Sequence, residues 1–177
     1  MGFIERRNWS QQFIPELSKI VGPFLLQPTT YHHDAREATD LIMLNARDLR
    51  IACRVRRAGY ADRYPYDFTI RASNDAGYPT ELEKIIKGFG DWMIYAHEGA
   101  AGSLARWFII DLDVFRAELI EDGYRDDRLL PRGAIPTENP DGSSFFAFDV
   151  RRLPPEGVIG SSHEIPFFAL ENNVETW

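Results

Sequence analysis

Two near-continuous apolar runs, Trp92–His97 and Arg106–Leu112, restrict most strongly the folds open to this chain. A strand that is apolar on both faces must be covered on both sides, so each run predicts a central strand in a layered sheet. Shorter strand patterns occur at three further places, which are Thr39–Leu44, Arg47–Arg57 and Phe68–Ala72. Helical spacing of apolar residues predicts three helices, which are Gln11–Val21, Thr80–Phe89 with Thr80 as its cap, and Val114–Glu121 with Asp113 as its cap.

The order of these elements predicts the fold class. Helix, three strands, helix, two strands and helix follow one another, which is typical of an α/β protein with a mixed central sheet flanked by helices. Beyond residue 127 the chain becomes rich in Pro and Gly, and alternating apolar residues at Phe146, Phe148 and Val150 predict a strand there. We therefore expect a core at residues 1–127 and an irregular, β-rich C-terminal extension at 128–177 that packs on it.

The composition excludes several classes of protein. Of the 177 residues, 44% are hydrophobic, which is too many for a disordered chain. The single cysteine, Cys53, excludes an internal disulfide and a Cys-rich zinc site, so we expect a reducing compartment, the cytoplasm. The first residues contain no apolar segment of a secretory signal, and no apolar run approaches the roughly 20 residues that cross a bilayer. We expect no membrane partner.

A row of arginines lies on one face of the predicted strand Arg47–Arg57. Apolar side chains on one face of this strand alternate with three arginines on the other, which are Arg50, Arg54 and Arg56. Seven arginines and three acids between Arg47 and Arg71 give a local charge of +4 in a chain of net charge −7. Because these guanidinium groups repel one another, something negative must lie opposite. The sequence leaves three alternatives open, namely the protein's own acids, a phosphate backbone or a protein partner.

The element order between about residues 10 and 112, with Asp40 in the first strand and a charged second strand, resembles the PD-(D/E)XK nuclease superfamily. The resemblance implies a restriction-endonuclease-like core (α-β-β-β-α-β), in which the first three strands form a meander. It also implies metal-dependent hydrolysis of DNA phosphodiesters with Mg²⁺. Five segments are also similar to proteins from bacteriophage genomes, and these are residues 38–44, 47–57, 68–71, 80–97 and 107–116. A phage protein would act in the cytoplasm of the host cell.

The resemblance also implies roles for individual residues. In the superfamily, acids on the first two strands bind Mg²⁺ and a lysine two residues after the second acid activates water. Arg54-Val55-Arg56 occupies the place of that Glu-x-Lys motif, so Arg56 becomes a candidate phosphate clamp. The catalytic candidates are Asp40, Arg56 and Lys84. The candidate metal ligands are Glu16, Glu37, Asp40 and Glu81, and the predicted DNA contacts are Arg50, Arg54, Arg57 and Arg71.

Each of these interpretations has a simpler alternative. Asp40 fits an acid at a turn or a strand edge, and Glu81 with Lys84 fits helix capping and a surface ion pair. His97 ends a buried strand, which is typical of a histidine whose hydrogen bonds are satisfied in the core or at its rim. The missing Glu-x-Lys motif also favours a catalytically inactive binding module or a phage inhibitor of a host protein, and a homodimer is left open.

Overall fold

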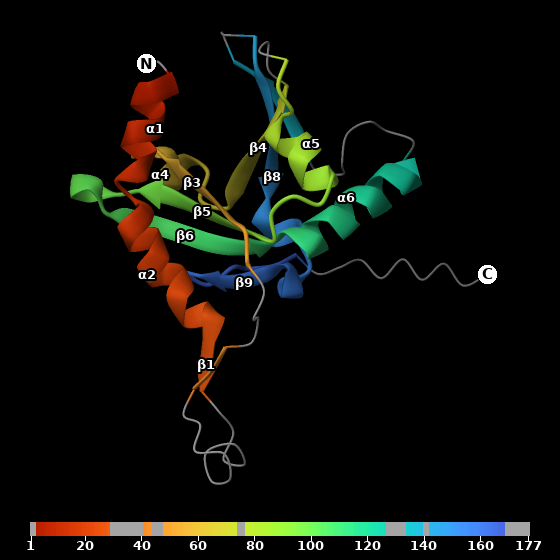
Figure 1. Cartoon of the computed structure of the whole chain (residues 1–177). Coiled ribbons are helices and arrows are strands. Elements are labelled where there is room, and N and C mark those ends of the chain that lie inside the picture. Colours follow the sequence, from red (N-terminus) through yellow and green to blue (C-terminus); the bar gives the residue numbers. More distant parts are fainter. Residues whose placement is uncertain are drawn as a thin grey trace, which may run out of the picture.

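The computed structural model describes residues 3–28, 41–43, 48–73, 77–126, 134–139 and 142–168, and these form a mixed α/β protein (Figure 1). Its α-helices are α1 Phe3–Gln11, α2 Ile14–Leu25, α4 Tyr60–Arg63, α5 Glu81–Ile86 and α6 Leu112–Asp126. Its strands are β1 Leu26–Pro28, β2 Leu41–Met43, β3 Ile51–Arg56, β4 Asp67–Ser73, β5 Trp92–Glu98, β6 Leu104–Asp111, β7 Ile135–Glu138, β8 Ser144–Asp149 and β9 Val158–Ser161. The predicted α/β class is confirmed.

A four-stranded sheet, in the order β3-β5-β6-β9, forms the centre of the molecule. Strands β3 and β5 are parallel, whereas β6 is antiparallel to both of its neighbours, β5 and β9. The sheet is therefore mixed, as predicted. Its two central strands contain the apolar runs of the sequence, and Ile94 and Ile109 are fully buried on one face while Met93 and Phe108 are fully buried on the other.

Different elements cover the two faces of this sheet. Helix α2 packs Phe13 at its N-terminal end, Leu17 and Val21 against one face. On the other face, β4, β8, α5 and α6 enclose a second cluster that contains Phe68, Phe115 and other aromatic side chains. The burial of both faces explains why the central residues of β5 and β6 are apolar and why their charged residues lie toward the strand ends.

A second sheet, in the order β4-β8-β7, stands across the first (Figure 1). Its inner side chains join the cluster around Phe68, which stacks on Phe148 with 5.3 Å between ring centroids. Phe115 of α6 packs edge-on against both rings. These aromatic contacts attach the second sheet to the central one, and pairs of this kind contribute about 0.5–1.5 kcal/mol each beyond the area they bury.

The strand pairings differ from the meander that the resemblance implies. Strand β2 pairs with β1, β3 pairs with β5, and β4 pairs with β8. The three successive strands β2, β3 and β4 therefore do not pair with one another within the described residues. Helix α4 turns the chain out of the central sheet after β3, and the phenylalanine-rich strand β8 supplies an apolar partner for β4.

The structure corrects two predicted helix boundaries, the end of α2 and the cap of α6, and confirms a third, the beginning of α5. The predicted helix Gln11–Val21 is observed as α2, which does not end at Val21 but continues through Pro23 to Leu25, because its apolar face keeps packing on the sheet beyond the proline. The cap of α6 is Asp111 rather than Asp113. Its Oδ1 atom accepts hydrogen bonds from the backbone amides of Asp113 at 2.8 Å and Val114 at 3.2 Å. Thr80 caps α5 as predicted, and together with Glu83 it forms a capping box.

Residues on both sides of position 127 contribute strands to each sheet, since β8 pairs with β4 and β9 pairs with β6. The division into a core at 1–127 and an extension at 128–177 stays a prediction. Among the residues with described positions, no helix is both long and apolar enough to span a membrane.

Candidate nucleic-acid interface

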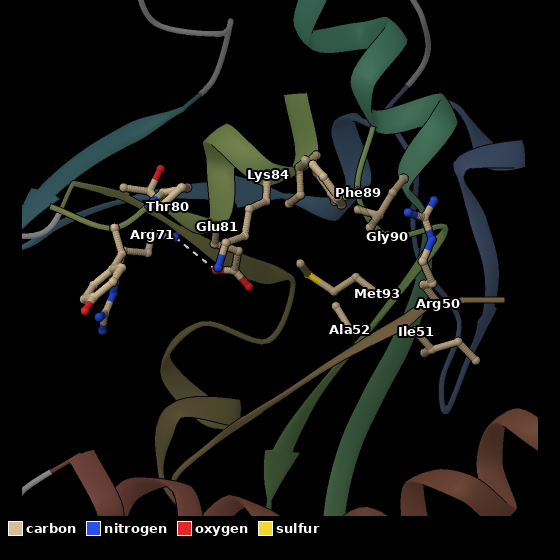
Figure 2. A pocket seen from close by; sticks show the side chains of 14 residues that line it. Arg50, Ile51, Ala52, Arg71, Thr80, Glu81, Lys84, Phe89, Gly90 and Met93 are labelled. Carbon is tan, nitrogen blue, oxygen red and sulfur yellow. Dashed lines mark hydrogen bonds between the residues drawn. The ribbon is translucent and has the colours of Figure 1, made fainter. Parts of the chain in front are cut away.

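An open groove of about 960 Å³ lies beside the start of β3, between α5 and the turn that leads into β5 (Figure 2). Its volume is at the upper end of the range for ligand sites. Six aliphatic, methionine or proline side chains contribute to its lining, and these are Ile51, Ala52, Pro79, Ile85, Met93 and Leu112. Its polar and aromatic lining residues are Arg50, Arg71, Tyr78, Thr80, Glu81, Lys84 and Phe89. The groove thus combines an apolar surface with three basic side chains.

Helix α5 places Glu81 and Lys84 on the groove. The Thr80 hydroxyl accepts a hydrogen bond from the Glu83 amide at 3.2 Å, and the Glu83 carboxylate accepts one from the Thr80 amide at 2.8 Å. This capping box fixes where the helix begins. Because residues three apart share one side of a helix, Glu81 and Lys84 both point to the groove, whereas Ile85 packs into the core.

Two of the predicted DNA contacts are held by carboxylates. Arg50 donates to Asp91 from its backbone amide at 2.8 Å and from Nε at 3.1 Å. This hydrogen bond and the charge of Asp91 raise the pKa of the Arg50 guanidinium. Arg54 forms an ion pair with Glu81. For these two arginines, the interpretation that the row is neutralised by the protein's own acids is confirmed.

Two basic residues of the groove carry no such partner. Within the described part of the chain, neither Lys84 nor Arg71 forms an ion pair, although the Arg71 backbone amide donates to Glu81 at 3.1 Å. In Figure 2, both lie toward the end of the groove that contains Glu81, and Arg50 lies at the opposite end near Gly90. Three cationic side chains and one carboxylate thus line the groove, which gives its lining a positive balance.

The aromatic rim of the groove includes Phe89, which sits between two glycines. Gly88 and Gly90 both have φ +82°, a conformation that favours glycine. Arg50 Nη2 donates to the Gly88 carbonyl at 3.2 Å, and Arg116 Nη1 donates to the Gly90 carbonyl at 3.3 Å. The Phe89 side chain is 57% exposed. The turn therefore holds a large apolar ring in solvent at the edge of a basic groove.

Other predicted site residues lie elsewhere. The guanidinium of Arg56 lies over the rings of Tyr60 and Phe145, at 5.1 and 5.6 Å from their centroids. Arg57 lies over the Trp9 ring at 5.0 Å. These contacts are cation–π interactions, and neither arginine lines the groove.

Of the four predicted metal ligands, the structure describes Glu16 and Glu81, and these two lie on different elements. Glu16 lies on α2, where its carboxylate accepts a hydrogen bond from the Leu104 amide at 3.3 Å. Glu81 lies on α5, on the opposite face of the central sheet. Glu37 and Asp40 lie outside the described residues. Among the residues that are described, no group of three or more His, Cys, Asp or Glu side chains could hold a metal ion.

His97 is buried as predicted, but its hydrogen bonding is not satisfied. Its Nδ1 atom has no hydrogen-bond partner among the described residues. Burial, together with the charges of Arg56, Arg106 and His163, lowers the pKa of His97 to about 4. The prediction of a satisfied core histidine is therefore wrong in this respect, and the ring is neutral at neutral pH.

Sequence reasoning identified the charged residues of the groove but missed its aromatic rim. Tyr78 and Phe89 were not singled out, although the segment Gly88-Phe89-Gly90 carries a usable signal. A large apolar residue between two glycines in a turn is typical of a side chain that the backbone presents to solvent.

The fold and the groove define an α/β protein with a basic, partly apolar surface site. No protein-family model matches the chain, and a search of curated proteins finds no match.

Proposed function

We propose that this protein is a nucleic-acid-binding module and that its groove binds the phosphates of a DNA strand. The observation that carries the proposal is the pair Arg71 and Lys84, which form no ion pair within the described residues. In a chain with 27 acids and 20 bases, carboxylates are abundant, yet none among the described residues neutralises these two cations. A cationic groove in an otherwise acidic protein attracts a polyanion to that place rather than to the whole surface.

The pairing of the other arginines supports the same proposal. Asp91 holds Arg50 at one end of the groove, and Glu81 holds Arg54 near the other. Such fixed guanidinium groups can still donate their remaining N–H groups to phosphate oxygens, while Lys84 contributes a mobile charge. The restriction-endonuclease-like core stays a prediction. The parallel pair β3–β5, with α5 in the connection between them, supports it, whereas the pairing of β2, β3 and β4 with other strands departs from its meander.

The second candidate function is Mg²⁺-dependent cleavage of the bound DNA. It is favoured by the presence of Glu81 and Lys84 on the same groove, where a carboxylate could contribute to a metal site and an ammonium group could stabilise charge on phosphorus. A host-protein partner and a homodimer stay predictions.

The binding proposal predicts that the double variant Arg71→Ala/Lys84→Ala binds DNA at least about 10-fold more weakly than the wild type, because two phosphate contacts are lost. The measurement is fluorescence anisotropy with labelled single-stranded, duplex and branched DNA at low salt. Lys19→Ala/Arg63→Ala is the matched control, because it removes the same charge from exposed positions outside the groove. Equal loss in both variants, or no DNA binding by the wild type, would overturn the proposal.

The same mixtures, incubated with Mg²⁺ or Mn²⁺ and with EDTA, test the second candidate. Cleavage that EDTA abolishes and that Asp40→Ala and Glu81→Ala each abolish would establish an enzyme. Binding without cleavage would contradict the second candidate function and would support binding as the function of the groove.

A further inference from the structure

The turn at Phe89 shows what kind of nucleic acid the groove accepts. We infer that the groove binds an unpaired strand, with one base stacked on the Phe89 ring and the neighbouring phosphates on Lys84 and Arg71. The inference rests on the proposed function and adds the class of ligand to it.

The first step is the fixed backbone position of Phe89. Two glycines with positive φ form the turn, and two arginines, Arg50 and Arg116, donate to its carbonyl groups. Arg50 is itself hydrogen-bonded to Asp91, the next residue of the turn region. Because the backbone that carries the ring is already held in place, a ligand that stacks on Phe89 does not have to order this turn, so more of the contact energy appears as affinity.

The second step is the chemistry of the surface beside the ring. Beside Phe89, the groove is lined by three apolar side chains that keep part or all of their surface exposed, and these are Ile51, Ala52 and Pro79. A phosphate gains nothing from such a surface, whereas the flat face of a base does. In a duplex the base faces are stacked on one another and cannot reach it. The combination of apolar surface and cations therefore fits an unpaired strand better than a duplex.

The third step is the order of the groups along the groove. In Figure 2, Phe89 lies between Lys84 and Gly90, with Arg50 beyond and Arg71 near Glu81 at the other end. Cationic side chains thus flank an aromatic one. In a single strand, phosphates likewise flank each base, and proteins that bind single strands combine basic grooves with aromatic stacking platforms.

The test compares three ligands that share negative charge but differ in their bases. An oligo-dT strand of about 12 nucleotides, its duplex with oligo-dA, and inorganic polyphosphate compete for the protein at fixed salt. We expect the single strand to bind about 10-fold more tightly than either competitor. Phe89→Ala should remove this preference, and Phe89→Trp should keep it. Ile86→Ala is the matched control, because Ile86 is 58% exposed on the neighbouring helix and does not line the groove.

The possible results distinguish a failure of this inference from a failure of the proposed DNA-binding function. If all three ligands bind equally and Phe89→Ala changes nothing, while Arg71→Ala/Lys84→Ala still weakens binding, the inference fails and the proposed function stands. If no ligand binds the wild type, both fail. A thermal unfolding curve for each variant shows that the exposed substitutions leave the fold intact.

Discussion

Individual charged side chains in this protein differ in what neutralises them. Arg50 and Arg54 are held by carboxylates, and Arg56 lies over aromatic rings. Lys84 and Arg71 have no ion-pair partner within the described residues. A count of arginines in the sequence does not reveal this difference, because it depends on which acids the fold places nearby.

His97 gives a prediction for the pH dependence of stability. The folded protein holds the pKa of His97 at about 4, below its ordinary value of 6.5, because the ring is buried and close to Arg56 and Arg106. Below pH 6.5 the unfolded chain therefore binds a proton that the folded chain excludes. This contribution to stability is complete above pH 6.5 and is lost as the pH falls from 6.5 toward 4.

The measurement is the free energy of unfolding of the wild type and of His97→Gln, obtained with denaturant at several pH values between 7 and about 4. The wild type should lose up to about 1.4 kcal/mol per pH unit more than the variant within this window. Parallel curves for the two proteins would contradict the assignment.

Among the elements, α2 makes one especially close contact with the central sheet, in addition to the packing of its buried face. The Phe24 ring packs on Gly160 of β9, where an added Cβ would lie 2.3 Å from Phe24 Cζ. The same ring contacts Trp107 edge-on, with 6.3 Å between centroids. This side of α2 can therefore approach the sheet only because β9 has a glycine at this position.

We predict that Gly160→Ala lowers the free energy of unfolding by about 1–3 kcal/mol, because the Phe24 ring has to move. Gly22→Ala is the control, because no atom lies within 4 Å of its added Cβ, and it should be neutral or stabilise the helix by up to about 1 kcal/mol. Denaturant unfolding measures both. If Gly160→Ala costs as much in a Phe24→Ala background as in the wild type, Phe24 is not the cause.

Elements with strong local signals could be predicted from the sequence. The strands β5 and β6 follow from their continuous apolar residues, and the beginning of α5 follows from Thr80 and Glu83. The extent of α2 could not be predicted, because tertiary packing outweighs the local effect of Pro23.

For the molecule as a whole, local pattern could not predict which strands pair. The partner of β4 is β8, more than 70 residues later in the chain. The pattern of apolar residues in a strand does not indicate which distant strand it pairs with. For the same reason, the sequence predicts only those parts of the site that a single element brings together. Lys84 and Glu81 lie together because one helix carries both, whereas Glu16 lies on the opposite face of the sheet because a different layer of the fold carries it.

The salt dependence of DNA binding tests whether the groove is the nucleic-acid interface. Affinity for the single strand is measured from about 50 to about 200 mM salt for the wild type and for Arg71→Ala/Lys84→Ala. If both side chains contact phosphates, the slope of log affinity against log salt becomes shallower by about 1.4 in the variant, since each contact with a single strand contributes about 0.7. An unchanged slope would show that neither side chain contacts phosphate, and it would contradict the assignment of the groove.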